Sequence, residues 1–197
     1  MNLFYKIFYP ICWLVVHIWH PFSKVIGREN IPQGACMICG NHSSMADPFW
    51  IGGVLGTKRP MKFMAKKEIM SVPIVGAFCR GMGAYGIDRG GADLAAVKAT
   101  LTYLKSGTSV IVFPEGTRVR PGKTVEPKTG AAMLAMRAGV PILPVYITQK
   151  KRPFCPIRLV FGEPYTPEIA GKRPTAAELE AITADLMERI YRMEAAA

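Results

Sequence analysis

Short apolar runs alternate with helical patterns along most of the chain after Gly27. Six of these runs predict β-strands because they are brief, apolar and bounded by polar or turn-forming residues. They are Cys36–Cys39, Lys62–Ala65, Ala84–Ile87, Val110–Phe113, Ile142–Ile147 and Ile157–Phe161.

Helical periodicity is clearest in residues 92–105 and 176–191. The first stretch places Leu94, Val97, Leu101 and Leu104 on one stripe, and the second does the same with Leu179, Ile182, Leu186 and Ile190. Thr175 and Glu178 have the spacing of a capping box at the start of the second helix. Strands separated by helices predict an α/β fold, a single domain with a mixed, largely parallel sheet flanked by helices. Ligands of such sheets gather on loops beyond the strand ends.

The N-terminal segment Ile7–Trp19 contains no formally charged residue. As a helix it would extend about 20 Å, short of the ~30 Å hydrocarbon core of a bilayer. Its tryptophans and the flanking Lys6 and Lys24 suit the headgroup level of a membrane. An ordinary core helix is the alternative, but apolar residues on nearly every face favour an interfacial helix. We therefore expect a membrane-associating helix in residues 1–26 and a catalytic domain in residues 27–197.

The chain is basic: 25 Lys and Arg face 14 Asp and Glu, giving a net charge of +11. Such an excess indicates an anionic partner, namely nucleic acid, an acidic membrane surface or a phosphorylated substrate. The basic residues are scattered and form no nucleic-acid-binding signature. We therefore expect no nucleic acid and favour a membrane surface with anionic lipids, with an unspecialised basic surface as the alternative.

Five cysteines, an odd number, occur in a chain without a recognisable secretory signal. This pattern favours reduced thiols and a position at the cytoplasmic face of the cell membrane, peripheral or monotopic. Cys36-x-x-Cys39 with the nearby His42 resembles part of a zinc site, but no second ligand cluster accompanies it. Because the pair lies in an apolar run, we interpret it as part of a buried strand and expect no metal.

The segment Gly81–Gly86 matches the Gly-x-Gly-x-x-Gly pattern of dinucleotide-binding loops. Such a loop must follow a strand and open a helix. Here a helix-like stretch, Ile74–Cys79, precedes the glycines and a strand-like run follows them. The order is reversed, so the sequence predicts no nucleotide cofactor at this segment.

His42 and Asp47 follow the first predicted strand of the domain and are five residues apart. A carboxylate on one imidazole nitrogen orients the ring and stabilises the cation formed when the other nitrogen accepts a proton. Five residues allow a turn or a helix start between His42 and Asp47, so that the two side chains can converge. We expect Asn41, Ser43 and Ser44 to cap that start. A purely structural His–Asp pair is the alternative. A serine nucleophile is disfavoured because the Gly-x-Ser-x-Gly pattern is absent.

A second polar segment, Phe113–Arg118, ends another predicted strand. It combines a turn through Gly116 with a carboxylate, Glu115, and a guanidinium, Arg118, which is suited to bidentate phosphate recognition. Glu115 would repel a phosphate, so we expect it to organise the loop or to hydrogen-bond a hydroxyl. An exposed turn with incidental charges is the alternative.

Together these segments resemble the motifs of the 1-acyl-sn-glycerol-3-phosphate acyltransferase family of glycerolipid acyltransferases. The four matching blocks are Asn41–Asp47 (Asn-His-x4-Asp), Gly83–Arg89 (Gly-x-x-x-Ile-Asp-Arg), Phe113–Arg118 (Phe-Pro-Glu-Gly-Thr-Arg) and Val140–Val145. Lys66 matches a lysine that the family places near the phosphate. Gly86 departs from the pattern, since the family more often has a bulky residue there.

The resemblance implies transfer of an acyl group from acyl-CoA or acyl-carrier protein to the sn-2 hydroxyl of 1-acyl-glycerol-3-phosphate, which makes phosphatidic acid in phospholipid biosynthesis. It implies that His42 is the base, that Asp47 orients it and that no cofactor is needed. The implied substrate-binding residues are Lys66, Arg89, Glu115, Gly116, Thr117 and Arg118. Two alternatives stay open: another lyso-lipid acceptor, such as a lyso-ornithine lipid, and a non-catalytic peripheral lipid-binding protein.

Overall fold

The computed structural model describes residues 3–57, 59, 61–88, 91, 93–120, 122–171 and 173–196. Within them one seven-stranded sheet has the order β1-β7-β6-β2-β5-β3-β4. Its strands are β1 (Lys24–Ile26), β2 (Met37–Gly40), β3 (Met61–Lys66), β4 (Ala84–Ile87), β5 (Ser109–Val112), β6 (Ile142–Ile147) and β7 (Arg158–Phe161). Neighbouring strands are parallel except for the antiparallel pair β6 and β7. The predicted α/β fold is confirmed, and the short edge strand β1 was not predicted.

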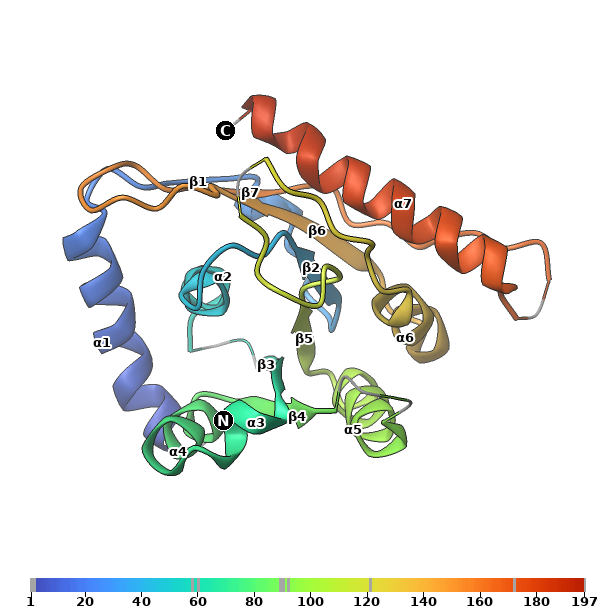
Figure 1. Cartoon of the computed structure of the whole chain (residues 1–197), viewed down its shortest axis with the longest axis horizontal. Helices are drawn as coiled ribbons and strands as arrows, with labels where there is room; N and C mark the ends of the chain where they lie inside the picture. Colours follow the sequence, from blue (N-terminus) through green and yellow to red (C-terminus); the bar gives the residue numbers. More distant parts are fainter. Residues whose placement is uncertain are drawn as a thin grey trace.

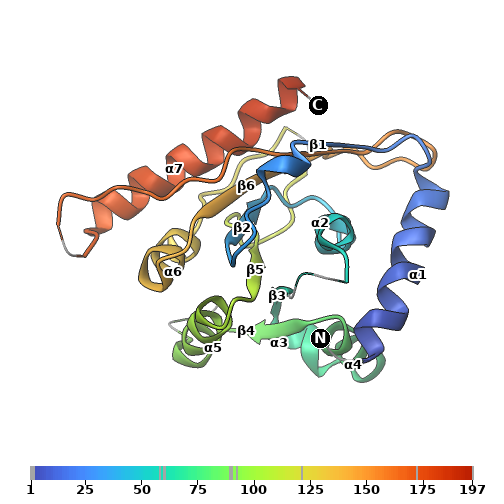
Figure 2. The same ribbon diagram turned by 180° about the vertical axis from the view of Figure 1, so that it is seen from behind.

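Helices cover both faces of the sheet. They are α1 (Leu3–Trp19), α2 (Asp47–Leu55), α3 (Lys67–Ser71), α4 (Pro73–Gly81), α5 (Leu94–Lys105), α6 (Gly130–Ala138) and α7 (Ala176–Arg192), with 3-10 turns η1 (Arg28–Asn30) and η2 (Met193–Ala196). Figure 1 shows α1 and α2 on one side of the sheet and α5, α6 and α7 on the other, and Figure 2 shows the same layers from behind. The capping box of Thr175 and Glu178 is present at the start of α7.

The central strands are buried on both faces, as expected of parallel strands between two helical layers. Every residue of β2 and of β6 is buried. Alternation along the chain sends Cys36 and Ile38 into the core under α1 and α2, and Met37 and Cys39 into the core under α6 and α7. Cys36 and Cys39 are therefore buried core residues, as the sequence predicts.

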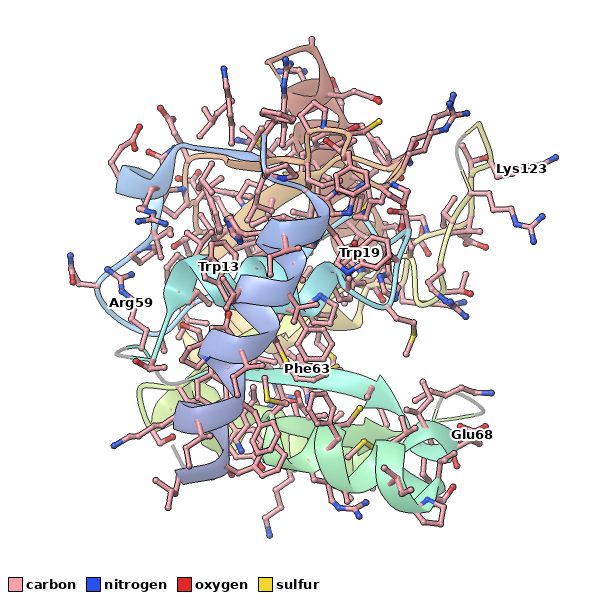
Figure 3. The ribbon with its side chains drawn as sticks, turned by 90° about the vertical axis from the view of Figure 1, so that its left-hand side faces the viewer. Trp13, Trp19, Arg59, Phe63, Glu68 and Lys123 are labelled. Atoms are coloured by element: carbon pink, nitrogen blue, oxygen red, sulfur yellow. The ribbon has the colours of Figure 1, made fainter. Side chains whose placement is uncertain are left out.

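Helix α1 contributes one face to the core and exposes the other. Tyr5 and Tyr9 are buried. The Trp13 ring packs directly on Gly53 of α2, because a Cβ on that glycine would lie only 1.9 Å from the ring. Figure 3, which looks onto α1, shows Trp13 and Trp19 along this helix. The opposite face exposes large apolar side chains: Leu3, Ile7, Ile11, Leu14 and Ile18. Within the described residues, each helix is too short or too polar to span a bilayer.

The glycine-rich segment Gly81–Gly86 joins the end of α4 to β4. A helix precedes it and a strand follows it, which confirms the predicted order and is the reverse of a dinucleotide-binding loop. A Cβ on Gly86 would lie 3.3 Å from the Cγ of Met70 and 3.5 Å from the Cα of Lys67. The missing side chain at this position therefore lets α3 pack closely against β4.

Candidate active site

The two segments predicted to carry the site residues, Asn41–Asp47 and Phe113–Arg118, meet at the carboxyl end of the sheet, which is called the carboxyl edge below. His42 follows the carboxyl end of β2, and Phe113–Arg118 follows the carboxyl end of β5. These strands are parallel neighbours, with Cys39 paired to Val112, so both loops leave the sheet side by side. Figure 3 shows Glu68, just after β3, and Lys123, in the loop after β5, on the side toward which β3 points.

The His42 ring is held by a buried carboxylate. Its Nδ1 lies 2.9 Å from Oδ2 of Asp47, the first residue of α2, and the same oxygen accepts hydrogen bonds from the backbone N–H groups of Ser43 and Ser44 at 2.7 and 2.8 Å. The Phe113 ring stacks on the imidazole with 4.2 Å between the ring centroids. The predicted convergence of His42 and Asp47 is therefore confirmed as geometry.

Asp47 has no exposed surface, yet its environment favours the ionised form. Burial is the largest single effect and would raise the pKa of its carboxyl, but the hydrogen bond from His42, the interactions with Lys151 and the hydrogen bond from the Ser44 backbone together outweigh it. The net result is a pKa below the ordinary value of 3.8. Because an ionised carboxylate only accepts hydrogen bonds, Nδ1 of His42 must be the donor.

The backbone of His42 is bound on both sides by the loop after β5. Its N–H donates to Oε2 of Glu115 at 2.7 Å, and its carbonyl accepts from the N–H of Val119, also at 2.7 Å. Glu115 is only 4% exposed, and its other oxygen accepts a hydrogen bond from the hydroxyl of Tyr191 in α7. Burial raises the pKa of Glu115, although these two hydrogen bonds oppose the effect. Its carboxylate thus organises the loop, one of the two expectations from the sequence.

Lys151 was not predicted as a site residue. It lies after β6, and its Nζ is 2.8 Å from Oδ1 of Asp47, 2.6 Å from Oγ of Ser43 and 2.7 Å from the carbonyl oxygen of Thr148. Burial lowers the pKa of the Lys151 ammonium, and the Asp47 carboxylate opposes that effect. In the sequence, Lys151 stands within a basic run that resembles a solvated surface, so no local signal marks it.

The expectation that Asn41, Ser43 and Ser44 cap a helix is wrong. Helix α2 begins without a side-chain cap. The Asn41 amide instead donates to the carbonyl of Ile147 and accepts from its N–H, both at 2.8 Å, which extends the pairing of β2 with β6. Ser43 accepts from Lys151, and Ser44 accepts from the N–H of Ala46 at 3.2 Å in the turn before the helix. All three residues brace the loop that carries His42.

Those predicted phosphate-binding residues that the structure describes lie near the carboxyl edge of the sheet. Lys66 is the last residue of β3, where its half-exposed ammonium is 3.0 Å from Glu68. Thr117 and Arg118 are exposed, and Gly116 makes the preceding turn with a φ of 65° that favours glycine. Arg89 lies outside the described residues.

A cavity of about 720 Å³ opens beside these groups. His42 and the segment from Phe113 to Thr117 form part of its wall. Apolar side chains from three strands and two helices extend it, among them Met64, Val97, Val112, Met133 and Leu134. Its volume falls within the about 300–1,000 Å³ common for ligand pockets. Within the described residues, His, Cys, Asp and Glu side chains form no group of three or more arranged to hold a metal ion.

Comparisons with known proteins agree with this architecture. The sequence model of the Acyltransferase family matches residues 23–148. The chain is 30% identical to a 1-acyl-sn-glycerol-3-phosphate acyltransferase of Bacillus subtilis over 178 residues, covering 87% of each chain. It is 34% identical to a Pseudomonas aeruginosa protein of the same name over 125 residues, covering 62% of this chain but only 48% of that relative. It thus spans about half the length of the Pseudomonas relative.

The structure is also similar to a solved one. The crystal structure of the 1-acyl-sn-glycerophosphate (LPA) acyltransferase PlsC from Thermotoga maritima superposes with a TM-score of 0.67 at 29% sequence identity. The match covers 95% of this chain and 81% of the Thermotoga chain. Both the sheet and the flanking helices therefore follow an architecture already observed in a protein of that name.

The depressed pKa of Asp47 predicts a specific dependence of stability on pH. A carboxyl whose folded-state pKa lies below its unfolded value stabilises the fold above the unfolded value, and this contribution is lost as pH falls through the folded pKa. The free-energy difference between the wild type and Asp47→Asn should therefore be largest above about pH 4 and shrink at lower pH. Urea titrations at a series of pH values measure it, and a difference that stays constant on acidification would contradict this assignment.

Proposed function

The chain belongs to the 1-acyl-sn-glycerol-3-phosphate acyltransferase family, and from this premise we propose that it esterifies the sn-2 hydroxyl of 1-acyl-sn-glycerol 3-phosphate. The acyl group comes from acyl-CoA or an acyl-carrier protein, and the product is phosphatidic acid. The observation that supports this proposal most directly is the 2.9 Å contact between His42 and Asp47, with His42 in the wall of a largely apolar cavity.

The chemistry follows from the orientation of the imidazole. Because Nδ1 of His42 donates to Asp47, Nε2 carries the lone pair and is the atom that accepts a proton. It takes the proton of the sn-2 hydroxyl as the oxygen attacks the thioester carbonyl, and Asp47 stabilises the imidazolium that forms. The carbon–sulfur bond then breaks, and the imidazolium returns the proton to the leaving thiolate. Atoms and charges balance without a cofactor, because the thioester is already activated.

Direct transfer fits the positions of the two serines. The hydroxyl of Ser43 contacts the ammonium of Lys151, and that of Ser44 accepts a backbone hydrogen bond. Among the described residues, the His42 ring contacts the Asp47 carboxylate and the Phe113 face and is not hydrogen-bonded to either serine hydroxyl. We therefore assign both serines to the scaffold, and the acyl group passes straight to the acceptor hydroxyl.

We assign the acceptor phosphate to the basic residues at the carboxyl edge. Arg118 is exposed in the loop after β5, three residues after the buried Glu115, and its planar guanidinium suits bidentate contact with a phosphate. Lys66 pairs with Glu68 only at the surface, where such ion pairs contribute little and a dianionic phosphate competes well. We include Arg89 in the same proposed set because it follows Ile87 by two positions in the sequence, and Ile87 pairs with Lys66 in the sheet.

The apolar part of the cavity suits an acyl chain. Its wall joins His42 at one end to side chains of α5 and α6, including Val97 and Leu134. An acyl chain that enters here leaves its carboxyl carbon near the imidazole, which brings the thioester to the acceptor hydroxyl. Such placement contributes through orientation, an effect of several kcal/mol in well-aligned reactions.

We place the protein at the cytoplasmic face of the cell membrane, peripheral or monotopic, with α1 as the membrane-associating helix. Leu14 and Ile18 are 60% and 61% exposed on its outer face, and Ile74, at the start of α4, is 84% exposed. The two helices are neighbours, because Phe4 and Phe8 both contact Phe78. Large exposed apolar surface of this kind is typical of a membrane or protein contact, and the net charge of +11 favours anionic lipids.

The base is tested by His42→Ala. In detergent micelles with 1-acyl-sn-glycerol 3-phosphate and acyl-CoA, the wild type should release thiol, and the variant should lose about 10²–10⁴-fold in rate because a general base typically contributes that much. Free-thiol detection measures the rate, and thermal unfolding checks that the variant is folded. Near-wild-type turnover by a folded variant would reject His42 as the base.

The phosphate contact is tested by Arg118→Ala. Losing a charge-assisted hydrogen bond of about 1.5–3 kcal/mol should raise KM for the phosphorylated acceptor about 10–100-fold, with a smaller change in kcat. Arg137→Ala removes the same charge from the exposed end of α6 and should behave like the wild type. An Arg118→Ala enzyme with an unchanged KM would place the phosphate elsewhere.

Membrane association is tested on the outer face of α1. Replacing Ile11, Leu14 and Ile18 together by Ser should lower partitioning onto anionic vesicles about a hundredfold, from roughly 1 kcal/mol for each half-exposed side chain. Leu94→Ser removes an exposed apolar side chain from α5 and serves as the control. Vesicle co-sedimentation measures both, and equal sedimentation of the triple variant and the wild type would exclude this face.

A further inference from the structure

A buried lysine contacts the far side of the Asp47 carboxylate. The side chain of Lys151 is only 9% exposed, while its sequence neighbours Lys150 and Arg152 are exposed. The three partners of its Nζ are Asp47, Ser43 and the Thr148 carbonyl. Its ammonium donates hydrogen bonds to Ser43 and to the Thr148 carbonyl and forms an ion pair with Asp47, so Lys151 is directed into the protein rather than toward a substrate phosphate.

The two oxygens of Asp47 have separate partners. Oδ2 accepts from His42 and from two backbone N–H groups, whereas Oδ1 faces Lys151. The ammonium therefore fixes the rotation of the carboxylate and supplies its counter-charge. Burying such a pair is costly unless both ions are hydrogen-bonded, which is the case for each ion here.

We propose that Lys151 is a positioning residue that balances the charge of Asp47 and so favours the uncharged form of the His42 imidazole, the form that accepts the hydroxyl proton. The inference rests on the proposed acyl transfer and adds to it the residue that sets its pH range. Lys151 acts through Asp47 and touches neither substrate in this assignment.

The charged groups that contact His42 are negative, and Lys151 supplies the positive charge beside them. Two carboxylates face it: Asp47 bonds its ring, and Glu115, itself bonded by Tyr191 of α7, bonds its backbone N–H. The stacked Phe113 ring brings no charge. Within the described residues, Lys151 is the only lysine or arginine that forms an ion pair with Asp47 or Glu115.

Coulomb's law gives the direction of the effect. Whatever the charge of Glu115, the positive charge of Lys151 repels a second positive charge on the nearby imidazole and so disfavours its protonation. Without Lys151, protonation neutralises the His42–Asp47 pair and is favoured. Charges a few ångströms apart in a protein interact appreciably, so without Lys151 the imidazolium should persist to higher pH.

The test compares Lys151→Met with Lys151→Arg, which keeps the charge, and with Lys150→Met, which removes the neighbouring exposed charge. Lys151→Gln, which is uncharged but can still donate to Asp47 and Ser43, makes the same comparison if the methionine variant does not fold. The first readout is NMR of ring-labelled histidine in the full chain in detergent micelles. The chain has three histidines, and His42→Gln identifies the resonance of interest.

We expect the titration midpoint of the His42 ring to rise by about one pH unit in the uncharged Lys151 variants, a tenfold change in proton affinity. Lys151→Arg and Lys150→Met should titrate as the wild type does, and the His17 and His20 rings serve as internal references. An unchanged His42 midpoint in a folded Lys151→Met or Lys151→Gln protein would overturn the proposal. This readout needs no turnover, so it decides the role of Lys151 even if the proposed acyl transfer fails.

The second readout is the pH profile of phosphatidic acid formation. In the uncharged variants the acidic limb of kcat/KM should move upward by about one unit, so activity falls about tenfold on that limb and recovers at alkaline pH, while KM for the acceptor changes little. A loss of the same size at every pH would show a merely structural role and overturn the proposal. A wild type without turnover would instead reject the proposed function.

Discussion

The peptide groups on both sides of His42 are hydrogen-bonded to the loop that follows β5. Glu115 accepts from the His42 N–H, and the Val119 N–H donates to the His42 carbonyl. Because Glu115 also accepts a hydrogen bond from Tyr191, it joins the loop after β2, the loop after β5 and the C-terminal helix α7. The backbone around His42 thus fixes where its ring lies, and Phe113 and Asp47 then set how it faces.

The two buried carboxylates near His42 have different tasks, and their environments separate them. Asp47 receives the imidazole, two backbone N–H groups and Lys151, which together hold its pKa down despite burial. Glu115 has fewer donors for its burial, and its pKa is raised. Divergent environments for paired titratable groups are a mark of assigned acid–base roles. Here they leave Asp47 as the partner of the imidazole and Glu115 as the anchor of the backbone.

Local apolar runs in the sequence were enough to predict most strands of the sheet. The bounds of β4 and β6 agree with the runs Ala84–Ile87 and Ile142–Ile147. Every residue of β6 is buried, and such a strand leaves a continuous apolar segment in the sequence. Strand β1 has only three residues and exists through its pairing with β7, more than 130 positions later, so no local run marks it. Helix α6 is rich in alanine and glycine, and such small residues give no apolar stripe although they pack between larger elements.

At the site, sequence reasoning found the groups that are neighbours along the chain or stand in motif blocks. His42 and Asp47 are five residues apart, and a turn suffices to bring them together. Lys151 and Asn41 were missed or misassigned because their partners are set by the tertiary fold. Lys151 reaches Ser43 across 108 positions, and Asn41 reaches Ile147 across 106. Only the neighbouring positions of β2 and β6 in the sheet make either contact possible.

The proposed reaction transfers an acyl group to the sn-2 hydroxyl of a glycerol-phosphate lipid. The decisive measurement is mass spectrometry of the lipid that the purified chain forms from 1-acyl-sn-glycerol 3-phosphate and an acyl thioester of a different chain length. We expect phosphatidic acid with the donor chain at sn-2. Unchanged acceptor with free fatty acid as the only new product would show hydrolysis and rule out the proposed transfer.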